Sequence, residues 1–165
     1  MSEVVIALGA NLGDPTSALK AAIRDLGAFD GIRVTDVSQF YTTSPVASSG
    51  PDYVNAVVVV ETVLAPLAVL RACQAIENAH GRVRPAGIVN APRTLDLDVI
   101  HYEGVISDDP VLTLPHPRMH ERLFVLVPLS DVRPDWVLVD GRSVREAISD
   151  VKSKHPDQQI RRLDV

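Results

Sequence analysis

The apolar and polar positions of this chain repeat with the two periods expected of strands and helices. Alternating or continuous apolar runs predict strands over residues 4–9, 32–41, 53–63, 95–102 and 136–139. Helical spacing predicts helices over residues 15–26, 66–80, 121–131 and 144–151, the first begun by Asp14-Pro15 and the second ended by Gly81. Val34, Val37 and Phe40 are expected in the core, and residues 152–165 are expected to form a polar tail.

The order of these elements is β-α-β-β-α-β, followed by an extra strand and helix. That order is typical of the split βαβ, or ferredoxin-like, arrangement, an α+β fold whose antiparallel sheet is flanked by helices. A chain of 165 residues is long enough to bury one core. We therefore expect a single domain over residues 1–165.

Charge and cysteine content narrow the classes of partner. The net charge of −5 argues against a nucleic-acid-binding surface. The single cysteine, Cys73, excludes an internal disulfide and favours a reducing compartment. The chain shows no secretory signal and no apolar run long enough to cross a bilayer. We expect a cytoplasmic protein without membrane or nucleic-acid partners, and a monomer, because no heptad or exposed apolar stripe stands out.

The chemistry of the chain concentrates in residues 95–99. Leu95, Leu97 and Val99 share one parity of a predicted strand, and Asp96 and Asp98 share the other. Successive side chains of a strand point to opposite faces, so the two carboxylates lie on one face, roughly 6.5–7 Å apart. Oxygen ligands this compact suit Mg²⁺, which binds one or two carboxylates together with substrate phosphates. A half-buried strand with a wet outer face would show the same alternation.

A cluster of arginines in the same stretch favours the metal interpretation. Arg82, Arg84 and Arg93 precede the two aspartates, and guanidinium groups fit phosphate oxygens. Arginines alone would be explained by a solvated surface. Together with paired carboxylates they predict a polyphosphate site of the two-metal type.

A possible acceptor pocket begins the strand over residues 53–63. Tyr53 and Asn55 are two residues apart and therefore share a face, which places an aromatic ring beside an amide that donates and accepts hydrogen bonds. A flat heterocycle with an amide-like edge would suit both. Alternatively, Tyr53 belongs to the core and Asn55 satisfies a turn. His116, held between Pro115 and Pro117, has few structural reasons to be there, and we expect it to be functional.

The motifs at residues 81–84 (G-R-V-R) and 92–98 (P-R-T-L-D-L-D) resemble the hallmark of the 6-hydroxymethyl-7,8-dihydropterin pyrophosphokinases of folate biosynthesis. The resemblance extends from residue 7 to about residue 136. It implies transfer of diphosphate from ATP to the hydroxymethyl oxygen of the pterin, with release of AMP. The implied catalytic residues are Arg82, Arg93, Asp96 and Asp98, with two Mg²⁺ ions held by the two aspartates. It also implies that residues 84–92 close over the reactants as a lid.

The resemblance further implies two sets of binding residues. The pterin would be bound by Thr43, Ser44, Val46, Tyr53, Asn55 and Phe124. ATP would be bound by Gln74, Glu77, Arg84, Arg93, Val99, Thr113, His116 and Arg122. Without the resemblance, Phe124 would be assigned to a helix core, and Gln74 with Glu77 to an exposed helix face.

Two other functions fit the same residues. The first is a metal-dependent nuclease or phosphohydrolase that uses Asp96 and Asp98 to activate water. The second is a binding module that has kept the fold without the activity. A module of that kind would be expected to lack at least one of the implied catalytic residues, and this chain has all of them.

Overall fold

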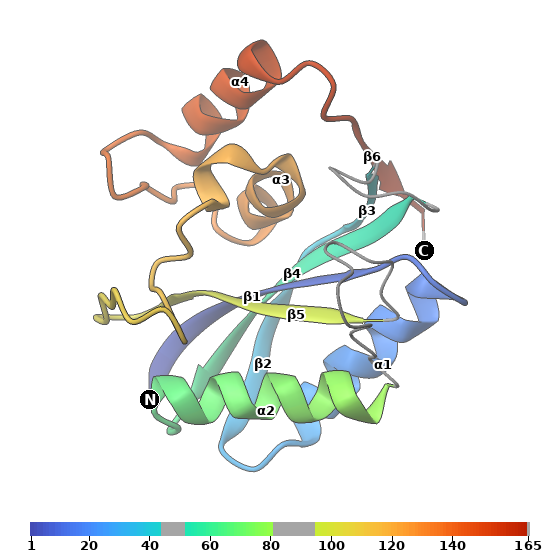
Figure 1. Cartoon of the computed structure of the whole chain (residues 1–165), viewed down its shortest axis with the longest axis vertical. Coiled ribbons are helices and arrows are strands. Elements are labelled where there is room, and N and C mark those ends of the chain that lie inside the picture. The colour runs from blue at the N-terminus through green and yellow to red at the C-terminus, as the bar shows by residue number, and fades with distance from the viewer. Residues whose placement is uncertain (44–51, 81–94, 165) are drawn as a thin grey trace.

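The chain folds into one sheet with helices on both faces (Figure 1). The structure is a computed structural model and describes residues 1–43, 52–80 and 95–164. In chain order the elements are β1 (Ser2–Ala10), α1 (Pro15–Ala28), β2 (Ile32–Val37), β3 (Phe40–Thr43), β4 (Tyr53–Thr62), α2 (Pro66–Ala79), β5 (Asp96–Tyr102), the 3₁₀ helix η1 (Met119–Glu121), α3 (Leu123–Val132), α4 (Val144–Lys154) and β6 (Ile160–Leu163).

The strand order confirms the predicted ferredoxin-like core. The sheet runs β5-β1-β4-β3-β6, and β2 also pairs with β4, beyond β3 along the same edge. All of these pairs are antiparallel. If β2 and β3 are counted as one broken strand, the core order is fourth, first, third, second, as the βαββαβ arrangement requires.

Each face of the sheet packs on its own apolar cluster. Val4, Ile6 and Leu8 of β1 point toward α1 and α2, whereas Val5 and Ala7 point toward α3 and α4. Figure 1 shows these two helical layers on opposite sides of the strands. The helix α3 lies between β4 and α4 and buries apolar residues on several sides, as expected of a helix that is apolar all round.

The predicted strand over residues 32–41 is interrupted. It divides into β2 and β3 at Ser38, whose backbone N–H donates to Val57 O (2.9 Å) and whose Oγ accepts from Val57 N (2.9 Å). A side-chain hydroxyl thus replaces one backbone partner, and the chain changes course without leaving polar groups unpaired. Phe40 is buried as predicted, but Val37 is 44% exposed, so its assignment to the core was wrong.

The C-terminal predictions need two corrections. The tail predicted over residues 152–165 was wrong for the part that the structure describes, because α4 continues to Lys154 and β6 pairs with β3. Residues 136–139 do not form a strand; Val137 makes only an isolated bridge with Ser143. The extra strand is therefore β6, which covers the edge that β3 would otherwise expose.

The predicted helix starts agree with the structure where capping residues mark them. Asp14 Oδ1 accepts from Ser17 N (3.2 Å) at the start of α1, with Pro15 in the first turn. His80 is the C-cap residue of α2, while the predicted cap Gly81 lies outside the described residues. Within the described ranges, no helix has the length and apolar character needed to cross a membrane.

Candidate active site

The predicted acidic and acceptor residues lie in neighbouring rows across one face of the sheet. In β5, Asp96 is opposite Gly9 of β1, and Gly9 is opposite Asn55 of β4. One step along, Asp98 is opposite Ala7. Directly paired residues point to the same face, and strands lie about 4.8 Å apart, so Asp96 and Asn55 are separated by about 10 Å of sheet. Gly9, the position between them, has no side chain, and Ala7 beside Asp98 has only a methyl group.

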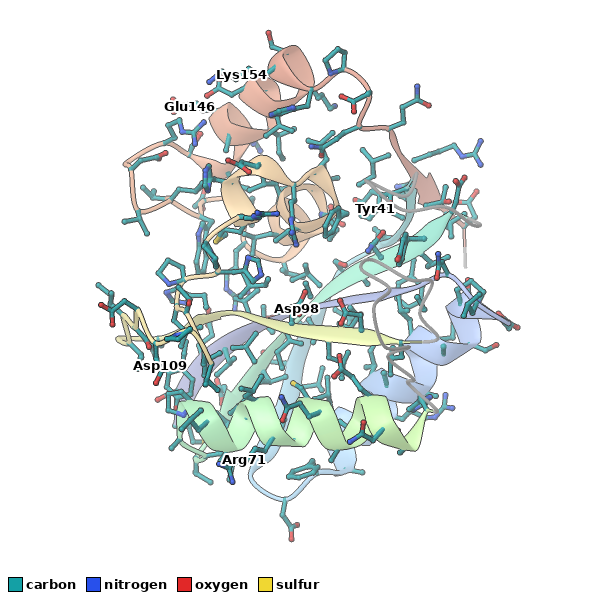
Figure 2. The ribbon with its side chains drawn as sticks, viewed as in Figure 1. Tyr41, Arg71, Asp98, Asp109, Glu146 and Lys154 are labelled. Atoms are coloured by element: carbon teal, nitrogen blue, oxygen red, sulfur yellow. The ribbon has the colours of Figure 1, made fainter. Side chains whose placement is uncertain are left out.

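The alternation predicted for residues 95–99 is confirmed. Leu95, Leu97 and Val99 are buried in the cluster beneath the sheet. Asp96 and Asp98 are half-buried on the opposite face. Figure 2 shows Asp98 between β5 and the layer that contains α3. The two carboxylates are therefore presented together, as the sequence predicted.

Two of the predicted pterin residues are joined directly. Thr43 Oγ1 donates to Asn55 Oδ1 at 2.6 Å, and both side chains are 6% exposed. The bond fixes the orientation of the Asn55 amide, and its Nδ2 lies toward Gly9 of β1. A Cβ atom placed on Gly9 would lie 2.9 Å from that Nδ2, so only glycine leaves room for the amide here.

The predicted aromatic residues come from two layers. Tyr53 is half-buried on β4 and shares the strand face of Asn55. Phe124 of α3 is half-buried against the apolar cluster that covers this face. The guanidinium carbon of Arg122 lies 5.4 Å from the Phe124 ring centroid, within the range of a cation–π contact.

His116 is held firmly against β5. Its backbone N–H donates to Ile100 O (2.8 Å), at a β-bulge where the pairing of β5 with β1 shifts register. Its ring Nδ1 accepts from Arg118 N (3.2 Å). Burial, then the charges of Arg122 and Arg118, lower the pKa of His116, although Asp96 opposes them. The neutral ring therefore carries its proton on Nε2, which is a hydrogen-bond donor.

Arg122 lies within electrostatic reach of both carboxylates. Burial lowers the pKa of its guanidinium, while Asp98 and Asp96 raise it. A half-buried arginine remains charged, because the ordinary pKa of a guanidinium group is far above neutrality. The segment that precedes α3 thus brings a cation and a neutral imidazole within electrostatic range of the acidic residues.

The remaining predicted nucleotide residues differ in accessibility. Gln74 is exposed, but Glu77 is 4% exposed and its Oε2 accepts from Leu97 N (2.8 Å). The side chain of Val99 is buried, so only its backbone could contact a nucleotide. Thr113 is half-buried and its Oγ1 donates to Asp109 O (3.0 Å). Five predicted residues lie outside the described residues: Ser44, Val46, Arg82, Arg84 and Arg93.

The donor set around β5 fits magnesium better than a transition metal. Among the described residues, no group of three or more His, Cys, Asp and Glu side chains could hold a metal ion. A pair of carboxylates is the protein contribution expected when substrate phosphates and water supply the other ligands of Mg²⁺. Asp96 and Asp98 provide that pair on one face.

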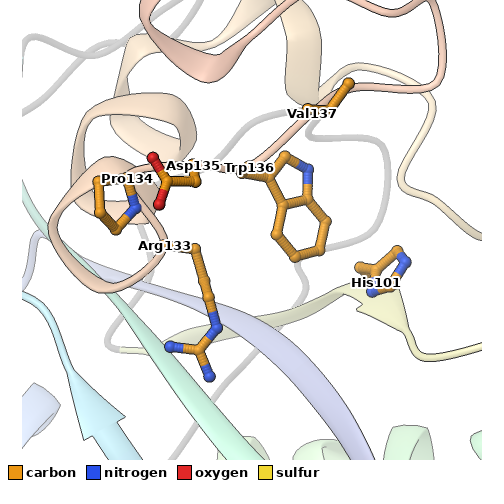
Figure 3. A pocket seen from close by; sticks show the side chains of 6 residues that line it. All are labelled: His101, Arg133, Pro134, Asp135, Trp136 and Val137. Atoms are coloured by element: carbon orange, nitrogen blue, oxygen red, sulfur yellow. The ribbon is translucent and has the colours of Figure 1, made fainter.

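A pocket of about 440 Å³ lies near the other end of β5 (Figure 3). It is lined by His101, Arg133, Pro134, Asp135, Trp136 and Val137. The rings of His101 and Trp136 meet edge to face with centroids 4.7 Å apart. Arg133 already bonds Glu3 and Asp36. None of the lining residues belongs to the predicted site.

Sequence reasoning missed three residues near the site. Ala7 and Gly9 form the low surface between the acidic pair and Asn55, and Arg118 adds a second cation near His116. A signal for the first two was present, because the small residues 7 and 9 share one parity of β1 and the large residues 6 and 8 the other. Arg118 carried no signal beyond its place next to Pro117.

Comparison with known proteins identifies a matching family. The family model described as 7,8-dihydro-6-hydroxymethylpterin-pyrophosphokinase matches residues 5–134. A 2-amino-4-hydroxy-6-hydroxymethyldihydropteridine pyrophosphokinase of Methylorubrum extorquens is 42% identical over 150 residues, covering 90% of this chain and 93% of the relative. The enzyme of the same name from Haemophilus influenzae is 40% identical over 149 residues, covering 90% and 92%.

Solved structures with the same fold are longer proteins. A crystal structure of an HPPK-DHPS in complex with substrates superposes with a TM-score of 0.76 over 99% of this chain, at 13% identity. A Plasmodium falciparum HPPK-DHPS gives 0.73 over 99% of this chain, at 14% identity. The chain spans about half the length of these proteins (47% and 48%), and the likeness shows the fold alone.

Proposed function

Because the chain belongs to the 7,8-dihydro-6-hydroxymethylpterin-pyrophosphokinase family, we propose that it transfers diphosphate from ATP to 6-hydroxymethyl-7,8-dihydropterin. The products are AMP and the pterin diphosphate, a step of folate biosynthesis. The observation that best supports this activity is the sheet register that aligns Asp96, Gly9 and Asn55 on one face. An acidic pair suited to Mg²⁺ and an amide suited to the acceptor then face the same space.

The acceptor end of the site is built on β3, β4 and α3. The hydrogen bond from Thr43 orients the Asn55 amide, so that its Nδ2 is the group left to meet a polar ring edge. Tyr53 and Phe124 supply aromatic surface from the sheet and from the helical layer. Ser44 and Val46 complete the proposed set. A pterin is flat and has alternating donors and acceptors along one edge, which suits an amide between aromatic rings.

The phosphate end of the site is built on β5 and the α3 layer. Asp96 and Asp98 would hold two Mg²⁺ ions, which when bound neutralise charge on the triphosphate. His116 donates from Nε2 and Arg122 contributes fixed positive charge. Arg82, Arg84 and Arg93 belong to the proposed set by their place in the motif. Gln74 and Thr113 remain predicted nucleotide residues through their side chains and Val99 through its backbone. Glu77, which is buried and accepts from Leu97 N, would act on the nucleotide only through the strand that it holds.

The reaction requires positioning more than covalent help from the protein. The hydroxymethyl oxygen of the pterin attacks the β-phosphorus of ATP and loses its proton to water, and the bond from the β-phosphorus to the oxygen of the α-phosphate breaks. AMP leaves with that oxygen. The residues of this chain hold the attacking oxygen and the β-phosphorus in line and offset the phosphate charge.

A single assay separates this function from the two alternatives. Protein, Mg²⁺ and ATP are incubated with and without the pterin, and AMP and phosphate are quantified. AMP that forms only with the pterin supports the diphosphokinase. Phosphate release without the pterin would indicate a hydrolase, and binding of ATP without either product would indicate a binding module.

Replacing Asp98 tests the proposed site. We expect Asp98→Ala to lower kcat by about 10³-fold or more, because metal-based charge stabilisation is worth several kcal/mol. The circular dichroism spectrum should be unchanged, since the side chain is half-buried and belongs to neither apolar cluster. The exposed Asp108→Ala is the matched control and should keep kcat within twofold. Equal activity of both variants would reject the assignment.

The proposed setting is a monomer in the cytoplasm that acts on small molecules. The single cysteine, Cys73, cannot form an internal disulfide, and a chain without disulfides is typical of a reducing compartment. The net charge of −5 remains unfavourable for nucleic acid. Fractionation of the native host would test the compartment.

A further inference from the structure

Glu77 is a buried carboxylate on the helix that packs against β5. Glu77 is 4% exposed. The other buried residues of α2 are Val69, Ala72, Cys73 and Ile76, so Glu77 is the one charged residue on the buried face of the described helix. Oε2 accepts the backbone N–H of Leu97 at 2.8 Å, which is one of the interactions of this carboxylate. Fully buried glutamates are rare unless they are paired. Leu97 is the residue between Asp96 and Asp98.

The position of β5 in the sheet explains why Leu97 needs this partner. Among the strands of the described residues, β5 ends the strand order and pairs with β1 on one side only. Alternate N–H groups of such an edge strand point away from the sheet and have no strand to bond. Glu77 accepts one of them, at the point where the acidic pair leaves the strand. The bond ties α2 to the outer side of β5.

We propose that Glu77 is a positioning residue for the metal-binding pair: by holding the Leu97 amide it sets the backbone from which both carboxylates project. This inference rests on the proposed function of Asp96 and Asp98 as Mg²⁺ ligands. Asp96 precedes and Asp98 follows Leu97, the residue whose amide Glu77 accepts. Hydrogen bonds on both edges of β5, to β1 and to Glu77, restrict the backbone more than pairing with β1 alone. The positions of the two carboxylates then vary less. Partners that orient metal ligands typically affect affinity or activity 10–100-fold.

Electrostatics support the same arrangement. The charges of Glu77 and Asp98 both contribute to raising the pKa of Cys73, after the larger effect of burial. Both carboxylates are therefore within electrostatic range of one buried thiol, Glu77 from the same helix and Asp98 from β5. Glu77 acts through the backbone of β5, and its 4% exposure leaves little surface for direct contact with a nucleotide.

Three variants on α2 test this role. Glu77→Met has a similar length but no carboxylate acceptor, and Glu77→Gln keeps an acceptor oxygen. Arg71→Met is the matched control, an exposed long side chain on the same helix (Figure 2). Each protein is measured by amide hydrogen exchange at Leu97, by calorimetric titration of Mg²⁺ with α,β-methylene ATP bound, and by AMP binding without Mg²⁺.

We expect Glu77→Met to accelerate exchange at Leu97 and to weaken Mg²⁺ binding, each about 10-fold or more. AMP affinity should change less than twofold, because no nucleotide contact is lost. Glu77→Gln should stay within about threefold of the wild type in all three measurements, and Arg71→Met should match the wild type. Loss of AMP affinity in Glu77→Met with unchanged Mg²⁺ binding would overturn the proposal in favour of nucleotide contact.

The wild-type protein provides a test that does not depend on folding of the variants. Its Leu97 amide should be protected from exchange although it lies on the outer side of an edge strand. Exchange as fast as that of exposed loop amides would overturn the proposal. If the wild type formed no AMP from ATP and the pterin, the proposed function would fail instead, and the exchange result would be unaffected.

Discussion

At the scale of single residues, Gly9 leaves the space that the Asn55 amide needs, because it has no side chain. The amide of Asn55 lies over Gly9, and Thr43 fixes its orientation with a 2.6 Å hydrogen bond. A methyl group at position 9 would have to displace a buried amide that has little freedom to move. Glycine is required here by close approach of a side chain.

We expect Gly9→Ala to raise KM for the pterin about 10-fold with a smaller effect on KM for ATP. The added Cβ would lie 2.9 Å from Asn55 Nδ2, and a shifted amide loses about one hydrogen bond, worth roughly 1–1.5 kcal/mol. Steady-state kinetics with each substrate varied in turn measure both constants. Gly13→Ala is a poor control because Gly13 has φ of 66°, whereas Gly27→Ala adds a methyl group with ordinary contacts. Unchanged KM for the pterin would contradict the assignment of Asn55.

His101 makes stability depend on pH. Burial lowers its pKa, while Glu3 and Glu103 raise it; Arg133, Asp135 and the Trp136 ring also line its surroundings. Because the pKa is lower in the folded state, the unfolded chain binds the proton more readily. The free energy of unfolding therefore falls as pH drops below about 6.5.

We expect His101→Gln to reduce this pH dependence. Urea unfolding at about pH 7.5 and about pH 5.5 should show a smaller loss of stability in the variant than in the wild type. Overall stability should also fall by about 1 kcal/mol, because the ring contact with Trp136 is lost. His116 also has a lowered pKa and is retained in both proteins. An identical loss in the two proteins would contradict the assignment.

At the scale of elements, the C-terminal segment stabilises two other parts of the fold. β6 extends the sheet beside β3. Just before it, Gln158 joins η1 to α3: Leu123 N donates to its Oε1 (3.1 Å), and its Nε2 donates to Glu121 O (2.9 Å). The first of these bonds satisfies an amide at the start of α3, where the helix has no internal partner to offer.

We expect Gln158→Ala to lower the free energy of unfolding by about 1–2 kcal/mol, since two hydrogen bonds to the backbone are lost. The neighbouring Gln159 is exposed, so Gln159→Ala should change stability by less than about 0.5 kcal/mol. Urea unfolding of both variants measures the difference. Equal stability of the two would show that Gln158 does not hold the helix start.

At the scale of the whole molecule, one sheet separates two apolar clusters. Val58 of β4 faces α1 and α2, whereas Val57 and Val59 face α3 and α4. The sheet belongs to both clusters, so neither helical layer can be lost without exposing its central strands. This arrangement favours unfolding as one unit.

We therefore expect one cooperative unfolding transition that is the same by circular dichroism and by Trp136 fluorescence. Sedimentation should give a monomer of 17.9 kDa, as expected for a single domain over residues 1–165. Two transitions would show that the helical layers are independent. A mass that rises with concentration would instead show association. Val137 and Val139 are exposed apolar residues, so they would be replaced by serine first to test whether they form the contact.

Local periodicity was enough to predict much of this protein. The alternation of residues 95–99 placed Asp96 and Asp98 on one face, and the two-residue spacing placed Tyr53 with Asn55. Both follow from the period of a strand, which belongs to the chain itself. Two predictions failed for different reasons. Alternation continues through residues 32–41, but the hydroxyl of Ser38 takes a backbone partner and the strand breaks there. The segment that contains β6 is polar, so its pattern did not predict a strand.

Only the tertiary structure decided which of these faces meet. Asp96 and Asn55 share a row because β1 lies between their strands, and residues so far apart in sequence are joined by backbone pairing that no local pattern specifies. The same holds for His116, which is placed by a bulge in β5, and for Glu77, whose burial depends on α2 covering the outer side of that strand. Side-chain chemistry is a property of the sequence, whereas proximity arises from the packing of the whole chain.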